Sequence, residues 1–318
     1  MISFIIPVRD DAEHLERCLR SIRASAGSIA HEIVVVDNGS RDDSVGVARR
    51  AGARVLSRPG CRVAELRNAG AGEASGELLA FIDADHEIVP GWAAAGLALV
   101  ADAAVSGAGA QYRAPIEGTW VQRTYDRLRN HQPGSRPVGW LPSGNLLVRR
   151  AAFDRIHGFD ASLETCEDVD LCQRLRQAGG TLMASDAMAS THRGDPRTLK
   201  ALFVGELWRG RDNLRVSLRG PLSWREAPSL VLPILYLAAL AATVTGLVTW
   251  QHGGWQLTVP GLITIGLLTI VRTVALLRPR SGRSAAAALQ SLLVGTVYDT
   301  ARALALVTLA GHGLRRKS

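Results

Sequence analysis

The chain has 318 residues, of which 47% are hydrophobic and 21% are charged, and it contains four cysteines. This composition excludes a disordered chain and a disulfide-rich mini-protein. The formal net charge is +8, but residues 228–318 carry eight of the cations and one acid, so residues 1–227 are nearly neutral. We therefore expect no nucleic-acid partner for the N-terminal part, and the cations that flank the apolar C-terminal part favour a membrane surface.

Short apolar segments alternate with helical patterns over the first 82 residues. Strands are expected over residues 2–6, 32–36, 53–56 and 78–82, and helices over residues 10–25, 42–51 and 62–74. Asp10 is expected to cap the first helix, with Glu13 completing a capping box. The alternation predicts an α/β fold with a mostly parallel sheet covered on both faces.

Residues 104–196 have a more mixed pattern. An extended segment is expected over residues 138–148, around a Pro-Ser-Gly-Asn turn, and a helix over residues 165–178, which stops at a Gly-Gly pair. We expect residues 1–196 to form one domain. No signal-peptide pattern precedes the first strand, which favours a cytosolic start.

Residues 197–225 are basic and amphipathic, with seven cations, two acids, and leucine and aromatic side chains at roughly helical spacing. Such a segment can lie on an anionic membrane surface, and the alternative is a helix packed on its own domain. Because an uncharged apolar segment follows at once, the interfacial interpretation is favoured.

Three apolar segments in residues 226–318 are long enough to cross a membrane, which takes about 20 residues. They cover residues 228–250, which have no charge, residues 257–277, interrupted by Arg272, and residues 285–310, which contain Asp299 and Arg302. We therefore expect a membrane domain with two or three transmembrane helices. In a third span, Asp299 and Arg302 would neutralise each other.

The loops between these segments predict their orientation. Residues 251–256 contain no Lys or Arg, whereas residues 278–284 contain three arginines, so the positive-inside rule predicts a cytoplasmic N-terminal part. A third span would place Arg315, Arg316 and Lys317 outside, so two membrane helices are favoured. The alternative to a third span is that this segment forms an amphipathic or re-entrant helix.

Polar and acidic residues follow three of the predicted strands. They are the segments Pro7-Val8-Arg9-Asp10, Asp37-Asn38-Gly39-Ser40 and Asp83-Ala84-Asp85-His86. In a parallel α/β sheet, ligands bind at these strand ends. The chain lacks GxGxxG after the first strand and lacks GxxxxGK[ST], which disfavours a dinucleotide dehydrogenase and a P-loop NTPase. An Asp-x-Asp pair at a strand end suits Mg²⁺ or Mn²⁺ together with phosphate oxygens.

Six motifs occur in a characteristic order, at residues 3–9, 33–40, 67–70, 81–85, 143–145 and 167–171. With these motifs, residues 1–195 resemble a family 2 glycosyltransferase with the GT-A fold, a Rossmann-like and mostly parallel sheet. The C-terminal transmembrane helices would follow this catalytic domain.

The resemblance implies a role for each motif. The nucleotide sugar would be bound by Pro7, Val8, Arg9, Asp37, Asn38, Arg67, Asn68, Asp83, Ala84, Ser143, Gly144 and Asn145. Asp85 would hold the metal on the diphosphate, and His192 stands where related enzymes sometimes place a metal ligand. Asp168 would be the catalytic base of an inverting transfer, with Glu167 as the second choice. The alternative for both acids is that they only stabilise the start of their helix.

The sequence departs from the family pattern in two places. His86 stands where the family often has a further acid, and we expect a solvated loop residue there rather than a ligand. The Gln-x-x-Arg-Trp signature of processive synthases is absent, which predicts the addition of a single sugar.

These interpretations predict a membrane-anchored, inverting, metal-dependent glycosyltransferase of cell-envelope glycolipid or polysaccharide assembly. It would use a UDP- or GDP-sugar, act on a hydroxyl of a lipid-linked or glycan acceptor, and be a multi-pass protein of a bacterial-type inner membrane with a cytoplasmic catalytic domain. A hydroxyl acceptor needs a general base, whereas a phosphate acceptor is already ionised. The alternatives are a polyprenyl-phosphate sugar synthase on the same fold and a non-catalytic nucleotide-binding membrane scaffold.

Overall fold

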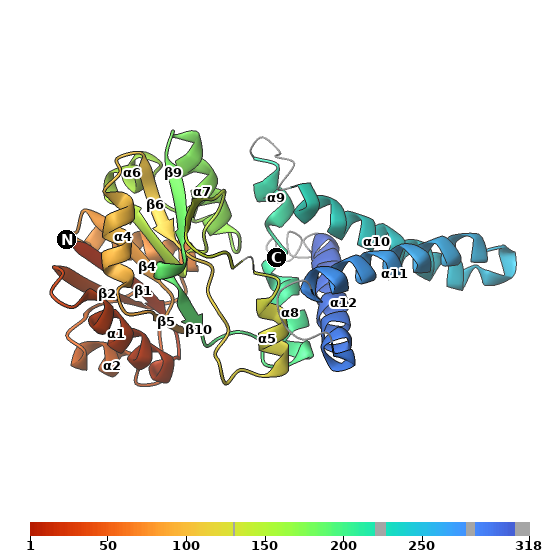
Figure 1. Cartoon of the computed structure of the whole chain (residues 1–318), viewed down its shortest axis with the longest axis horizontal. Helices are drawn as coiled ribbons and strands as arrows, with labels where there is room; N and C mark the ends of the chain where they lie inside the picture. Colours follow the sequence, from red (N-terminus) through yellow and green to blue (C-terminus); the bar gives the residue numbers. More distant parts are fainter. Residues whose placement is uncertain (130, 220–226, 278–283, 309–318) are drawn as a thin grey trace, which may run out of the picture. The chain divides into compact units, whose positions relative to one another are not determined.

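The computed structural model describes residues 1–129, 131–219, 227–277 and 284–308. The chain divides into two units (Figure 1). The first, which we call the sheet unit, comprises Met1–Ile116 and Arg129–Asp195, and the second, the helical unit, comprises Glu117–Leu128 and Pro196–Ser318. The helical unit thus takes a short segment from within the residues that were expected to form a single domain.

The sheet unit contains an eight-stranded sheet with the order β3-β2-β1-β4-β8-β6-β9-β7. Its parallel half confirms the four expected strands, as β1 (Ile2–Val8), β2 (His31–Asp37), β3 (Arg54–Ser57) and β4 (Leu78–Ile82). Its other half is mixed: β8 (Asn145–Arg149) is antiparallel to β4 and to β6 (Val105–Gly109), β9 (Thr181–Ser185) is parallel to β6, and β7 (Ser135–Pro137) is antiparallel to β9. A separate antiparallel pair joins β5 (His86–Ile88) to β10 (Ser190–His192).

Helices cover both faces of the sheet, as expected (Figure 1). They are α1 (Ala12–Ala26), α2 (Ser44–Arg50), α3 (Val63–Glu73), α4 (Trp92–Val100), α6 (Arg150–Arg155) and α7 (Glu167–Gln177), with a short 3₁₀ turn η1 (Asp186–Met188). Strand β1 is buried along its length, and its side chains alternate between two cores. Phe4 and Ile6 belong to the core with α1 and α4, and Ile5 belongs to the core with α3 and α7.

The expected capping box at the first helix is wrong. The helix begins at Ala12, and Asp10 instead accepts a hydrogen bond from the backbone N–H of Arg41. The backbone N–H of Ala12 has no acceptor within the helix and donates to the carboxylate of Asp42, 2.8 Å away. The cap therefore comes from the loop after β2. A cap supplied from another segment satisfies the orphan donor as well as a local one, and local sequence does not reveal it.

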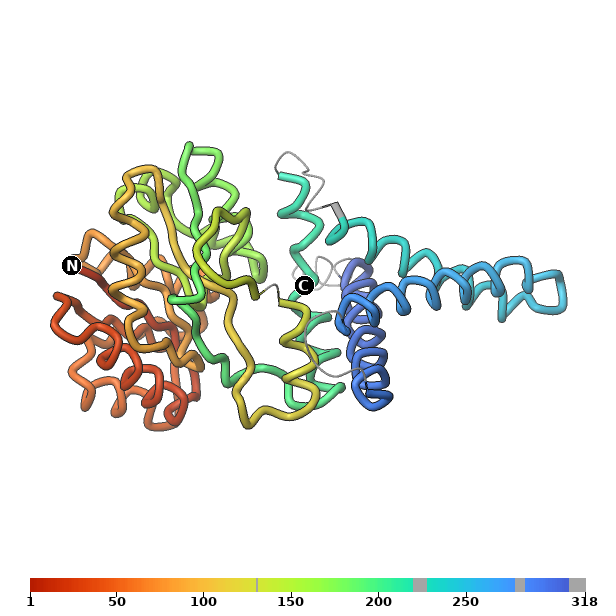
Figure 2. Tube along the Cα trace, in the orientation of Figure 1, coloured from red at the N-terminus to blue at the C-terminus, as the bar shows by residue number. Residues whose placement is uncertain are grey.

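The helical unit contains α5 (Trp120–Asp126), α8 (Leu199–Arg209), α9 (Asn213–Ser217), α10 (Ala227–Val248), η2 (Trp250–His252), α11 (Trp255–Leu277) and α12 (Ala285–Thr308). Helices α10 and α11 form a long hairpin (Figure 2). Both contain a segment long and apolar enough to cross a membrane, Pro228–Val248 and Trp255–Leu277, and in the described part of the chain these two alone meet that criterion.

Several sequence predictions fall partly outside the described residues. They concern Arg225, the three arginines of residues 278–284, the end of the third segment at residues 309–310, and the C-terminal cations at 315–317. Within the described part, α8 buries Leu202 and Glu206 and packs against α12. The membrane-surface role of residues 197–225 stays a prediction. Asp299 is bound by Arg272 of α11, 2.6 Å away, an interhelical pair that the sequence did not predict.

Candidate active site

A buried arginine joins two of the motifs at the carboxyl edge of the sheet. Arg67 of α3 is 2% exposed, and it donates to Asp83 at 2.6 Å and to Glu167 at 2.7 Å. Ser143 also donates to Glu167, at 3.2 Å. Burial opposes the charge of Arg67, but the two carboxylates more than offset it and raise the pKa of the guanidinium above its ordinary value. The structure therefore connects the loop after β4 directly to the start of α7.

Asp168 lies next to this network with a different environment. Its carboxylate accepts a hydrogen bond from the backbone N–H of Val169, at 2.8 Å. Burial, reinforced by the adjacent Glu167 carboxylate and only partly opposed by Arg67, raises the pKa of Asp168 to about 7. Of the two acids, Glu167 is held by Arg67 and Ser143, whereas Asp168 has the proton affinity of a general base that works near neutral pH.

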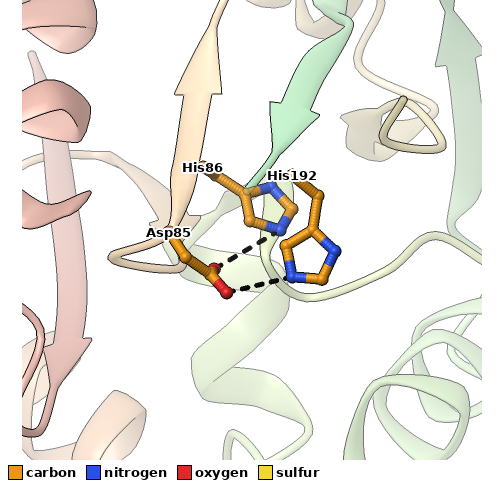
Figure 3. Close-up of side chains that lie close together, drawn as sticks. All are labelled: Asp85, His86 and His192. Carbon is orange, nitrogen blue, oxygen red and sulfur yellow. Dashed lines mark hydrogen bonds and ion pairs between the residues drawn. The ribbon is translucent and has the colours of Figure 1, made fainter. Parts of the chain in front are cut away.

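Asp85, His86 and His192 form a second cluster on the same edge (Figure 3). His192 Nε2 lies 3.0 Å from Asp85 Oδ2, and His86 Nε2 lies 3.9 Å from Asp85 Oδ1. The antiparallel pairing of β5 with β10 places His86 directly opposite His192, which explains why the two imidazoles meet. One ligand atom from each residue lies within 4.8 Å of the others, so the three side chains could hold a metal ion.

His86 corrects the sequence prediction. It was expected to be a solvated loop residue, but it is 1% exposed and belongs to β5. Burial, reinforced by the positive charge of His192, lowers the pKa of His86 to about 4. A neutral imidazole is the form that binds metals.

Further side chains orient the two histidines. Nδ1 of His86 lies 3.0 Å from Ser190 Oγ, and Nδ1 of His192 lies 2.7 Å from Asp195 Oδ1. Burial opposes protonation of His192, but Asp85 and Asp195 overcome it and raise its pKa to about 9. Hydrogen-bonded Nδ1 atoms leave both Nε2 atoms facing Asp85, the arrangement found around metal-ligating histidines. A metal ion that displaces the proton of His192 would find a donor set of one carboxylate and two imidazoles, which fits a divalent transition metal such as Mn²⁺.

Asp195 is itself held in place. It is 1% exposed and is bound by Arg129, whose guanidinium lies 4.2 Å from the centre of the Tyr112 ring. Sequence reasoning missed Asp195, Arg129 and Tyr112. The spacing His192-x-x-Asp195 was the one available signal, because Tyr112 and Arg129 come from distant parts of the chain.

The three asparagines of the motifs bind backbone. Asn38 exchanges hydrogen bonds with the backbone of Cys61, and Asn68 exchanges two with the backbone of Phe159. Asn145 is fully buried, donates to two backbone carbonyls and accepts from a buried indole. These amides hold loops together, and their contact with a donor stays a prediction.

The other expected nucleotide-sugar residues lie at the strand ends. Pro7 and Val8 end β1, Arg9 is exposed just beyond it, and Ala84 is buried between the two acids of the loop. Asp37 is 4% exposed and accepts from the backbone N–H groups of residues 39 and 40. Gly144 passes so close to Asp83 that an added Cβ would lie 2.4 Å from its carboxylate.

Comparisons with known proteins agree with this geometry. The family model described as glycosyl transferase family 2 matches residues 3–159. These residues form a family 2 glycosyltransferase domain. The domain carries five of the six motifs in full, and the expected GT-A-like α/β fold is confirmed.

Similar proteins include two named glycosyltransferases. The pre-mycofactocin glycosyltransferase of Mycobacterium tuberculosis is 30% identical over 196 residues, which cover 57% of this chain and 40% of that protein. Glycosyltransferase AglE of Haloferax volcanii is 28% identical over 249 residues, covering 74% of this chain and 80% of that protein. The match thus spans about two fifths of the mycobacterial relative. Among solved structures, a mannosyltransferase from Pyrobaculum calidifontis, in complex with GDP-Man and Mn²⁺, shares the fold with a TM-score of 0.59 at 14% identity, over 100% of this chain and 88% of that one.

Proposed function

We propose that this protein is a membrane-anchored, inverting, metal-dependent glycosyltransferase that moves a sugar from a nucleotide sugar to a hydroxyl of a lipid-linked or glycan acceptor. The observation that carries the proposal is that Arg67 pairs with both Glu167 and Asp83, the chain neighbours of Asp168 and of the Asp85 cluster. This arrangement supports Asp168 as the base and the Asp85 cluster as the metal site.

In this proposal Asp168 removes the proton from the acceptor hydroxyl as its oxygen attacks the anomeric carbon. The new C–O bond forms while the bond to the nucleoside diphosphate breaks, and the bonding electron pair leaves with the diphosphate. A single displacement inverts the anomeric centre. Arg67 positions Glu167 and Asp83 throughout, and Glu167 is therefore less suited than Asp168 to take the proton.

The metal would be Mn²⁺ or Mg²⁺, held by Asp85 and His192 with His86 beside them. When bound, it would offset the charge that develops on the leaving diphosphate. The mannosyltransferase from Pyrobaculum calidifontis was solved with Mn²⁺ and a GDP-sugar, which supports a metal and a nucleotide-sugar donor here as well. Asp37 and the end of β1 would receive the nucleobase, with Asp83 on the ribose side.

The membrane anchor is proposed from the packing of the α10–α11 hairpin. Small residues face each other inside it, since an added Cβ on Gly261 would lie 2.3 Å from Thr243 Oγ1 and one on Gly246 would lie 2.3 Å from Thr258 Oγ1. Large apolar residues face outward along both helices, among them Val231, Ile234, Val244, Leu262, Ile263, Leu267, Ile270 and Val271. A water-soluble helix pair would show the reverse pattern, whereas close packing through small residues is typical of membrane helices.

The dimensions of the hairpin support the same proposal. A helix of 22 residues, the length of α10, is about 33 Å long, and the hydrocarbon core of a bilayer is about 30 Å thick. Trp250 and Trp255 at the turn are both about half exposed, as expected for side chains at a membrane–water interface. With an uncharged turn outside, the sheet unit would lie on the cytoplasmic side of a bacterial-type inner membrane.

A panel of nucleotide sugars tests the donor and the metal together. Full-length protein in detergent is incubated with UDP- and GDP-sugars in Mn²⁺, Mg²⁺ or EDTA, and donor hydrolysis is measured, with Asp85→Asn as the matched variant. We expect one donor class to be hydrolysed, only with a metal, and at least 100-fold more slowly by the variant. Hydrolysis that persists in EDTA at the same rate would contradict metal dependence.

A second candidate is a polyprenyl-phosphate sugar synthase on the same fold. The raised pKa of Asp168 favours a hydroxyl acceptor, because an ionised phosphate needs no base. If Asp168→Asn transfers sugar to a polyprenyl phosphate at the wild-type rate, the protein is a polyprenyl-phosphate sugar synthase. A non-catalytic scaffold would show donor binding without hydrolysis or transfer.

A further inference from the structure

We propose that α12 lies in the plane of the cytoplasmic membrane interface and does not cross the bilayer. Its outer apolar face would rest on the boundary between lipid headgroups and acyl chains. The proposal rests on the membrane anchor proposed above, and it decides between two and three spans.

Helix α5 is connected at both ends to the sheet unit. Residues 117–128 leave the sheet unit after Ile116 and return to it at Arg129. The connections on either side of α5 are far too short to cross a bilayer, so α5 lies on the same side of the membrane as the sheet unit. Any helix packed along α5 is confined to that side as well.

Helix α12 packs along both α5 and α8. Val294 of α12 shares a buried cluster with Val121 and Tyr125 of α5 and with Leu202 of α8. Further along, the end of α8 meets α12 again, where an added Cβ on Gly210 would lie 2.5 Å from Ala305. The helix therefore stays beside elements of the cytoplasmic side over at least residues 294–305. Its start is also on that side, because a two-span hairpin returns α11 there.

The side chains of α12 divide between an exposed apolar face and a face packed on other helices. Leu289, Leu292, Leu293 and Val307 are exposed, and at 3.6 residues per turn they share one face. The residues that meet α5 and α8 lie on the opposite side of the helix. Thr300, eleven positions after Leu289, falls on the exposed face and donates to Tyr236 of α10. The apolar face therefore continues onto the root of the hairpin, and lipid that surrounds the hairpin would reach it.

The in-plane placement of α12 also explains how its charged residues Asp299 and Arg302 are accommodated. Asp299 and Arg302 would be costly at the centre of a bilayer, whereas at the interface they lie at headgroup depth. Asp299 is bound by Arg272, and Arg302 lies 3.9 Å from Glu206 of α8. In-plane placement keeps both pairs at one depth, near the end of α11 that adjoins the cytoplasmic side.

Spin-label depth measurements test the placement directly. Single cysteines at Leu289 and Val307 are introduced into full-length protein lacking the four native cysteines, reconstituted in phosphatidylethanolamine–phosphatidylglycerol vesicles. The two positions are 18 residues, or about 27 Å, apart along the helix. Ile263→Cys in the middle of α11 is the deep reference, and Arg20→Cys on α1 of the sheet unit is the aqueous reference. Depth is read from the relative accessibility of each label to oxygen and to a water-soluble nickel reagent.

We expect both α12 labels at the same shallow depth, with Ile263 deep and Arg20 in water. Depths that differ by 10 Å or more between Leu289 and Val307, with Ile263 still deep, would show that α12 crosses the membrane, which overturns the inference and leaves the anchor intact. If both α12 labels lie in water while Ile263 is deep, the in-plane placement of α12 is also overturned. An aqueous Ile263 would overturn both the anchor and the inference.

Discussion

Replacing Arg67 with methionine would leave two carboxylates at the sheet edge without their counter-charge. Methionine has a similar length and no charge, so the change removes both ion pairs and little volume. The Glu167 side chain is 11% exposed and the Asp83 side chain 35%, so water can compensate Asp83 far better than Glu167. Breaking a buried pair by removing one partner costs about 3–5 kcal/mol. In a domain of this size that corresponds to a fall in Tm of about 10 °C.

The assay is thermal unfolding of full-length protein in detergent, followed by near-ultraviolet circular dichroism. The double variant Arg67→Met/Glu167→Gln should recover more than half of the lost Tm, because the amide needs no counter-charge. Arg20→Met is the matched control, since its ion pair with Glu16 is 3.4 Å long and largely exposed, and it should shift Tm by less than 2 °C. A similarly small shift in Arg67→Met, or no recovery in the double variant, would refute the reasoning.

Three further predictions concern the metal site and the hairpin. Asp195→Asn should weaken Mn²⁺ binding about 10–100-fold, because His192 loses its orienting carboxylate; an unchanged titration by electron paramagnetic resonance would exclude that role. His86→Ala should lower Mn²⁺ affinity about tenfold and leave Mg²⁺ affinity nearly unchanged, because imidazole prefers transition metals; calorimetry showing equal losses would contradict a third ligand. Gly261→Leu should separate α10 from α11 and lower Tm in detergent, whereas Gly266→Leu, with open space around it, should not; equal shifts would contradict the packing.

The parallel half of the sheet could be predicted from the sequence because its signals are local. Short apolar runs separated by helical patterns fixed the four strands within two residues at each end, and the strand ends predicted where the acids gather. In the mixed half, most of β8 falls within the extended segment expected over residues 138–148, but its antiparallel pairing with β4 and β6 was not predicted, because these strands come together only through tertiary packing. That α5 belongs to the helical unit was not predicted either, because this too depends on tertiary packing.

The roles of single polar side chains were harder to predict. Motif resemblance assigns Asn68 and Asn145 to the donor, but the structure shows their amides bonded to backbone, a use that depends on distant segments. His86 was misjudged because its burial depends on pairing between β5 and β10, which are far apart in the chain. Capping of α1 by Asp42 was missed for the same reason.

The most direct test of the central claim is the rate of sugar transfer by Asp168→Asn across pH 5.5–9, measured with a donor that the variant still binds. With the pKa of Asp168 near 7, wild-type transfer should rise through neutral pH as the base loses its proton. The variant should bind donor and metal normally, transfer about 10²–10⁴-fold more slowly, and lose that rise. A variant that keeps wild-type rates with the same pH profile would show that another group removes the acceptor proton.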